Sequence, residues 1–339
     1  MTLKLSTEIV TLTTRHPFII ARGGQSDYRV VCVRLSDGDG LEGWGEASPS
    51  SYYGETADTV LEKLKLLERH LPSDPFDLDA AEARFAQVVP GNGAARAALS
   101  GALHDLVGKR LGVPLYKLWG LDPRKAPVSS FTIGIDTPEK TRAKIREAQG
   151  YAILKIKLGT DRDEEILRTI RDATDKPLRV DANAGWTRER ALRMLPILKE
   201  YGVEFVEQPL AADDLEGMAA VRKAGVLPIV VDESCIVAAD IPRVAQAADG
   251  INIKLAKCGS LREALRMIAT ARAHKMLVMV GCMIETSIGI TAAAHFTPLV
   301  DAADLDGAAL TSNDPYIGAE IDRGAIQIPG GPGLGVRRR

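Results

Sequence analysis

The sequence has few cysteines, little net charge and no long apolar run, and each shortage excludes a class of protein. Cysteine occurs only four times and forms no Cys-x-x-Cys pair, so we expect no disulfide framework and a reducing, cytoplasmic location. The formal net charge of −2 predicts no nucleic-acid partner. No segment holds 18 uninterrupted apolar residues, and the first ten residues lack the apolar stretch of a signal peptide, so we expect neither secretion nor a membrane partner.

The length of 339 residues predicts two domains, because single hydrophobic cores usually stop growing below this size. Residues 1–50 alternate as three strands, with loop-like segments at 14–24 and 48–54 where glycine and proline gather. Apolar residues then recur at helical spacing over 56–71 and 79–111. The sequence therefore predicts an α+β domain over residues 1–125.

Charged residues recur through the second part of the chain, each after a short apolar run. They are Lys157, Asp181, Glu207, Asp232 and Lys254, separated by 24, 26, 25 and 22 residues. A strand, a helix and two short loops have about this combined length. The spacing predicts an α/β fold, a (β/α)8-type barrel over residues 126–316, with a segment at 317–339 that returns to the capping domain. Helix starts are expected at Thr137-Pro138, at Asp161 and at Ser260.

Two lysines lie on one face of a predicted barrel strand. In the run from Ile153 to Leu158, the period of two places Lys155 and Lys157 on the same side and apolar residues on the other. The carboxyl ends of barrel strands converge on one face, where active sites of this fold are built. Paired lysines there favour a proton carrier, although lysines that protect a solvated edge strand are the alternative.

Three acidic residues follow successive apolar runs in the same way. Asp181, Glu207 and Asp232 would each stand at the carboxyl end of a strand. A single acid in this position is often a helix cap or a loop charge. Three in phase favour a divalent cation site, because carboxylate oxygens are the ligands that Mg²⁺ prefers.

The fifth repeat position offers two lysines, Lys254 and Lys257. Asn252 and Lys254 share the inward face if Ile253 and Leu255 face outward, whereas Lys257 falls in the following loop. We therefore expect Lys254 to be the functional lysine, and Lys257 to be a surface charge or a secondary polar contact.

Taken together, five short motifs resemble the muconate-lactonizing subgroup of the enolase superfamily. They occur in the expected order as Lys155-Ile156-Lys157, Asp181-Ala182-Asn183, Glu207-Gln208-Pro209, Asp232-Glu233-Ser234 and Asn252-Ile253-Lys254. The resemblance spans nearly the whole chain. It implies that Asp181, Glu207 and Asp232 hold one Mg²⁺ per subunit, which stabilises an enediolate, and that Lys157 and Lys254 act from opposite faces of the substrate carbon. Lys155 is implied as a third catalytic lysine beside Lys157.

The resemblance also implies residues that bind the substrate. Asp304-Leu305-Asp306 is similar to the eighth-strand motif of dipeptide epimerases, in which the two aspartates receive the substrate ammonium. Thr132 and Met283 match segments that contact the substrate in that subgroup. Arg22 stands near an arginine that similar L-Ala-D/L-Glu epimerases use to bind the glutamate carboxylate, with an offset of about one residue. An ordinary surface arginine is the alternative.

These residues lead us to expect a Mg²⁺-dependent isomerase that epimerises dipeptides by two-base 1,1-proton transfer, with L-Ala-D/L-Glu as substrate and a role in murein peptide metabolism. One related alternative is an epimerase for other dipeptides. Another is a muconate cycloisomerase or o-succinylbenzoate synthase, whose substrates carry no ammonium group. A barrel that only binds is a further alternative, but it would not need all three acids and both lysines. A homo-oligomer is expected.

Overall fold

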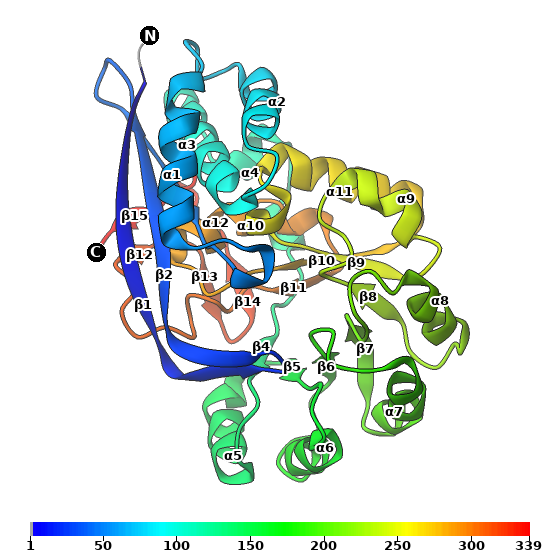
Figure 1. Cartoon of the computed structure of the whole chain (residues 1–339). Helices are drawn as coiled ribbons and strands as arrows, with labels where there is room; N and C mark the ends of the chain where they lie inside the picture. Colours follow the sequence, from blue (N-terminus) through cyan, green and yellow to red (C-terminus); the bar gives the residue numbers. More distant parts are fainter. Residues whose placement is uncertain (1–2) are drawn as a thin grey trace.

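The computed structural model describes residues 3–339 and places an antiparallel sheet against an eight-stranded parallel barrel (Figure 1), which confirms the predicted fold class. Met1 and Thr2, with which the predicted first domain begins, lie outside the described residues. The antiparallel sheet contains β1 (Lys4–Ile20), β2 (Gly23–Ser36) and β3 (Glu42–Ala47) in that order.

The hairpin formed by β1 and β2 is longer than the sequence suggested. We expected a loop at 14–24, and this is wrong, because Phe18 to Ile20 pair with Gly23 to Gln25. Pro17 fits into the extended strand because the register shifts between Thr13 and Phe18, and such irregularities tolerate proline. The tip of the hairpin reaches the barrel mouth (Figure 1), where the Ile135 amide donates to the Ile19 carbonyl at 2.9 Å.

Helices cover one face of the antiparallel sheet. The helices in this part of the chain, including the short 3-10 segments, are η1 (Ser51–Tyr53), α1 (Ala57–Leu67), η2 (Glu68–His70), α2 (Leu78–Val88), α3 (Gly93–Leu111), α4 (Leu115–Leu118) and η3 (Pro123–Lys125). The helix α3 lies so close to β3 that a Cβ atom on Gly43 or Gly45 would stand 2.0 or 1.9 Å from a carbonyl oxygen of α3. Glycine at these two positions therefore permits the close approach of β3 to α3.

The barrel strands follow one another in chain order around the sheet. They are β4 (Phe131–Ile133), β5 (Leu154–Lys157), β6 (Leu178–Asp181), β7 (Val203–Glu207), β8 (Ile229–Val231), β9 (Gly250–Ile253), β10 (Leu277–Gly281) and β11 (Ala302–Asp304). A bridge between Ser129 and Ala303 brings the first and last strands together. The carboxyl ends of all eight strands therefore lie at one rim of the barrel.

Helices connect the barrel strands. They are α5 (Pro138–Glu147), η4 (Ala148–Gly150), α6 (Asp163–Arg171), α7 (Arg188–Glu200), α8 (Leu215–Lys223), η5 (Ala238–Asp240), α9 (Ile241–Val244), α10 (Leu255–Cys258), α11 (Leu261–Ala273), α12 (Ser287–Ala294) and η6 (Thr297–Leu299). Thr137 and Ser260 cap α5 and α11 as predicted. The expected cap at Asp161 is wrong, because the Asp163 carboxylate instead accepts from the amides of Gly159 and Thr160.

After β11 the chain returns toward the antiparallel sheet through short strands. These are β12 (Tyr316–Ile317), β13 (Glu320–Asp322), β14 (Ala325–Gln327) and β15 (Arg337–Arg338). The final arginines are exposed, but they are held against the fold, because β15 pairs with β12 and Arg338 lies 3.2 Å from Glu8. The Leu334 amide donates to the buried Asp105 of α3, which ties the return segment to the cap helices.

Buried apolar side chains form two large clusters. One is built mainly from the barrel strands and their helices, and the other from the antiparallel sheet with α1, α2 and α3. The stripe predicted on α3, including Leu99, Leu103 and Leu106, belongs to the second cluster. Along residues 3–339, no helix has both the length and the apolar character needed to cross a bilayer.

Candidate active site

Five charged residues stand on neighbouring strand ends and form an arc along the barrel rim. Lys157, Asp181 and Glu207 are the last residues of β5, β6 and β7, and Asp232 and Lys254 directly follow β8 and β9. All five are buried. The backbone pairs Lys157 with Asp181 and Asp181 with Glu207, so neighbouring charges lie side by side. The 22 to 26-residue spacing in the sequence therefore becomes a continuous row of functional groups.

Lys155 lies below this arc and neutralises its acids. Its side chain is 0% exposed, and its Nζ lies 2.7 Å from Glu207 Oε2, 3.3 Å from Asp181 Oδ2 and 2.8 Å from Asp304 Oδ2. Burial alone would lower the pKa of Lys155, but attraction to Asp304, Glu207 and Asp181 outweighs it and raises this pKa well above the usual range. Lys155 is therefore held as a cation among three carboxylates.

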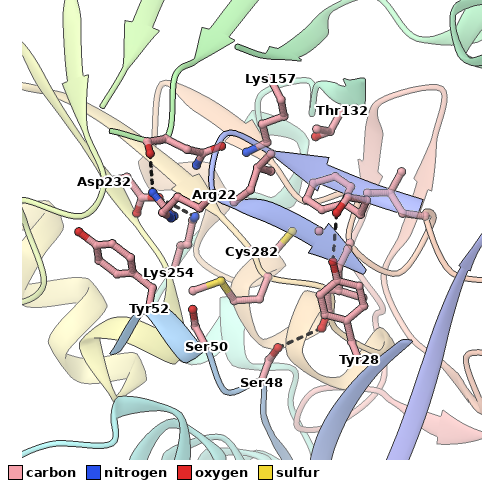
Figure 2. Close-up of a pocket in the computed structure, with 18 of the residues that line it drawn as sticks. Arg22, Tyr28, Ser48, Ser50, Tyr52, Thr132, Lys157, Asp232, Lys254 and Cys282 are labelled. Carbon is pink, nitrogen blue, oxygen red and sulfur yellow. Dashed lines mark hydrogen bonds and ion pairs between the residues drawn. The ribbon is translucent and has the colours of Figure 1, made fainter. Parts of the chain in front are cut away.

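The two lysines at the ends of the arc face each other across the barrel. Lys157 Nζ lies 2.7 Å from Asp181 Oδ2, and Lys254 Nζ lies 2.7 Å from Asp232 Oδ2. Their strands, β5 and β9, are four places apart in the order of eight, which is half the circumference. Figure 2 shows both side chains directed toward the same cavity. A ligand seated between them would meet one amine on each side.

Asp232 is contacted by a second lysine that the sequence analysis set aside. Lys257 is 4% exposed, and its Nζ lies 2.5 Å from Asp232 Oδ1. Of the two alternatives for Lys257, the surface charge is wrong and the secondary polar contact is confirmed, because the single turn of α10 folds Lys257 back under the rim to meet Asp232. Burial would raise the pKa of Asp232, but the charges of Lys254 and Lys257 outweigh it and lower this pKa.

The loops after β6 and β7 turn back sharply and orient the acids. Asn183, Ala184 and Gln208 have positive φ angles of 45°, 61° and 36°, an uncommon conformation that often marks functional sites. The turn lets the Asn183 amide donate to Asp181 Oδ1 at 2.8 Å. It also lets Gln208 Oε1 accept from the Asp232 amide at 2.9 Å. The strained backbone thus holds the Asp181 carboxylate and the main chain of Asp232 in place.

The three acids have the donor chemistry of a Mg²⁺ site. All are carboxylates on adjacent strands, and Glu207 Oε2 accepts no hydrogen bond among the described residues, although the Lys155 ammonium lies beside it. One oxygen of each acid lies 2.7 Å from a lysine ammonium. The pairs are Glu207 Oε2 with Lys155, Asp181 Oδ2 with Lys157, and Asp232 Oδ2 with Lys254. Within residues 3–339, no three acidic, histidine or cysteine side chains already surround one point. A bound cation would therefore take the place of lysine contacts at these oxygens.

The opposite part of the rim carries a second pair of carboxylates. Asp304 ends β11, and Asp306 lies two residues beyond it. Asp304 Oδ1 accepts from Ser130 Oγ at 2.8 Å and Thr132 Oγ1 at 3.3 Å. Asp306 Oδ2 accepts from the Thr132 amide at 2.6 Å. Burial and the neighbouring Asp304 raise the pKa of Asp306 to about 7.

The capping segments close the bowl above these groups. Arg22, from the turn between β1 and β2, donates to the Asn183 carbonyl at 2.6 Å and lies 2.8 Å from Glu233 Oε1. Its guanidinium also stacks on the Tyr52 ring at 4.4 Å. The cavity measures about 390 Å³, which suits a small-molecule ligand, and Met283 lines it with Arg22, Thr132 and the Asp304–Asp306 pair. Every substrate-binding residue expected from the sequence therefore borders this one cavity.

Both parts of the chain match known family models. Residues 4–120 match the model described as mandelate racemase / muconate lactonizing enzyme, N-terminal domain, and residues 139–339 match the enolase C-terminal domain-like model. The chain belongs to the enolase superfamily.

Within the enolase superfamily, the chain is similar to epimerases along nearly its whole length. An L-Ala-D/L-Glu epimerase from Bacteroides thetaiotaomicron is 46% identical over 329 residues, covering 96% of this chain and 86% of that protein. An L-Ala-D/L-amino acid epimerase from Maribacter sp. is 40% identical, covering 98% and 99%. The crystal structure of a Cytophaga hutchinsonii dipeptide epimerase with Mg and D-Ala-L-Val has a TM-score of 0.95 and 31% identity, covering 100% of this chain and 96% of that one.

Several residues of this enolase-superfamily site received no role from the sequence. Ser130 shares the inward face of the first barrel strand with Thr132, so the period of two could have identified it. The sequence analysis named Glu233 only as the middle residue of the Asp232-Glu233-Ser234 motif and gave it no role. Its ion pair with Arg22 joins segments that are more than 200 residues apart in the chain. No local pattern signals such a contact, and the same holds for the burial of Lys257.

Proposed function

We propose that this chain is a Mg²⁺-dependent dipeptide epimerase that inverts the α-carbon of the C-terminal residue, with L-Ala-L-Glu and L-Ala-D-Glu as its preferred pair. The observation that carries the proposal is the placement of Lys157 and Lys254 half a barrel apart, at the two ends of an arc of three carboxylates. Amines on both sides of a bound carbon acid suit inversion, because one takes the proton and the other supplies it.

The proton transfer uses one neutral and one protonated lysine. The neutral Nζ of Lys157 or Lys254 takes the α-proton and becomes an ammonium group. The ammonium of the other lysine then gives a proton to the opposite face of the same carbon, so the number of protons is conserved and the configuration inverts. The reverse reaction exchanges the two roles. Lys155, held as a cation by three acids, is proposed to keep positive charge beside Lys157 throughout.

Asp181, Glu207 and Asp232 are proposed to hold one Mg²⁺ per subunit. When bound, this ion would supply positive charge to the substrate carboxylate and so make the α-proton more acidic. The support comes from the donor chemistry of the three acids, their positions on adjacent strands, and the similar Cytophaga protein that was crystallised with Mg.

The dipeptide is proposed to lie with its ammonium toward Asp304 and Asp306. Asp304 already balances the Lys155 ammonium, whereas Asp306 accepts from the neutral amide and side chain of Thr132. We therefore assign the larger share of ammonium binding to Asp306, with Thr132 fixing its orientation. Met283 contributes an apolar wall, and Arg22 is proposed to receive the side-chain carboxylate of the second residue, since a guanidinium offers five donors in a fork.

Incubation of the protein with dipeptides in D₂O and Mg²⁺ tests this function. L-Ala-L-Glu should gain deuterium at the glutamate α-carbon and convert to the epimer, as followed by proton NMR. Exchange should stop with EDTA and return with added Mg²⁺. L-Ala-L-Gln, which has the same shape without the charge, should react roughly 10-fold or more slowly, because a hydrogen bond to a charged group contributes about 1.5–3 kcal/mol. If no dipeptide exchanges its α-proton, the proposal is wrong.

Replacing Asp306 with asparagine should separate a dipeptide epimerase from a lyase of the same fold. The variant should lose roughly 100-fold in kcat/KM for dipeptides, because loss of one partner from a buried charge pair costs about 2–5 kcal/mol. N-acetylated dipeptides carry no ammonium, so their slow reaction should be unchanged by the substitution. Equal losses for both substrate types would contradict the ammonium contact and favour a muconate cycloisomerase or o-succinylbenzoate synthase activity.

We also propose that residues 126–316 form the catalytic domain and that residues 1–125, with 317–339, form the cap. The two apolar clusters and the hydrogen bond from Leu334 to Asp105 support this division. All four cysteines are free thiols, which supports a cytoplasmic location. The expected homo-oligomer stays a prediction.

A further inference from the structure

Lys257 is surrounded by more acceptors than any single ion pair requires. Its Nζ lies 2.5 Å from Asp232 Oδ1, 2.6 Å from the Asp232 carbonyl, 3.0 Å from the Asn252 carbonyl and 3.2 Å from the Cys235 carbonyl. The side chain is 0% exposed. An ammonium group has three protons to donate, so all of them can be used within the protein. Lys257 is therefore fixed in place and does not reach the cavity.

The contact with Lys257 divides the two oxygens of Asp232 between different partners. Oδ1 faces Lys257, whereas Oδ2 lies 2.7 Å from Lys254, which borders the cavity. The carbonyl contacts anchor Lys257 to the ends of β8 and β9, so the carboxylate cannot rotate without breaking a buried ion pair. Oδ2 is thus held toward the cavity.

We propose that Lys257 is a positioning residue for Asp232. It retains Oδ1 so that Oδ2 would be available to a cation, and Lys254 would then be free to leave Asp232 and carry a proton. This inference rests on the proposed function, because it assumes that Asp232 is a Mg²⁺ ligand.

Two physical effects of Lys257 have opposite signs, which makes the inference testable. As a positive charge beside a ligand oxygen, Lys257 repels a cation, so charge alone predicts that its removal strengthens Mg²⁺ binding. As the group that orients Asp232, it supports the site, and loss of such a partner typically costs 10 to 100-fold in metal affinity. The direction of the change therefore decides between the two effects.

The experiment measures Mg²⁺ binding to the full chain by isothermal titration calorimetry, without substrate. Lys257→Met keeps most of the side-chain volume and removes the ammonium. We expect the Kd for Mg²⁺ to rise 10 to 100-fold, and we expect saturating Mg²⁺ to restore most of kcat, because Lys257 itself moves no proton. Lys257→Gln provides a second variant if the methionine protein does not fold.

Lys144→Met is the matched control. Lys144 is also buried and pairs with an aspartate, with its Nζ 2.9 Å from Asp136 Oδ2, but it lies on α5 outside the arc. Its loss should leave the Kd for Mg²⁺ unchanged. Unchanged or tighter binding in the Lys257 variants overturns the positioning role, while the wild-type exchange reaction still supports the proposed function. Failure of the wild-type chain to bind Mg²⁺ would overturn both.

Discussion

The Lys157→Ala and Lys254→Ala variants should each lose exchange from one epimer of the substrate and keep it from the other. Each lysine faces only one side of the cavity, because β5 and β9 are half a barrel apart. A positioned general base contributes about 10²–10⁴-fold, so exchange from the affected epimer should fall by this amount. Net epimerisation should be lost in both variants, since inversion needs both amines.

The measurement is the rate of deuterium incorporation from D₂O into L-Ala-L-Glu and L-Ala-D-Glu, each followed separately by NMR. The two variants should affect opposite epimers. Lys117→Ala, at an exposed position on α4, serves as the control and should exchange both epimers at the wild-type rate. Two variants that slow both epimers equally would contradict the assignment of one base to each face.

Replacing Lys155 with methionine should produce a large loss of stability in metal-free buffer. The substitution leaves Asp181, Glu207 and Asp304 without the buried cation that now lies within 3.3 Å of all three. Removal of one partner from a buried ion pair costs about 3–5 kcal/mol, because the remaining charge is neither hydrated nor compensated. We expect the free energy of unfolding, measured with urea in EDTA, to fall by about this amount.

Added Mg²⁺ should recover part of the stability lost in the Lys155 variant. A cation that binds the folded state stabilises it by mass action, and two of the acids released by the substitution are proposed ligands. Lys144→Met, which removes a buried lysine from Asp136 alone, should lose stability without any recovery in Mg²⁺. A Lys155 variant that unfolds at the wild-type urea concentration would show that the acids do not need this cation.

The arc of functional groups was predictable because a parallel barrel turns periodic spacing into proximity. Each charged residue ends its own strand, so a repeat of 22 to 26 residues is enough to place Lys157, Asp181 and Glu207 on one rim. The alternation of side chains also placed Lys155 inward correctly. These predictions needed no knowledge of contacts between distant segments.

The features that the sequence did not predict depend on such contacts. Pro17 and the paired glycines at 23 and 24 suggested a loop, yet the hairpin continues because a shift of register accommodates them. The sequence left Lys257 as a surface charge or a secondary polar contact, because its burial depends on the packing of α10 against α3, where a Cβ on Gly93 would stand 2.3 Å from the Lys257 carbonyl. A register shift within the sheet decides the first case, and packing between the two halves of the molecule decides the second.

The division of the rim into two arcs has a consequence for how this scaffold can be altered. Groups proposed for proton transfer and cation binding come from β5 to β9, whereas the rim groups proposed to bind the dipeptide come from β10, β11 and β4. Because separate strands carry the two sets, redesign of three strand ends could redirect the chemistry to a new carbon acid. The reactive half would keep its geometry only if Asp304 were retained, because Asp304 also pairs with Lys155.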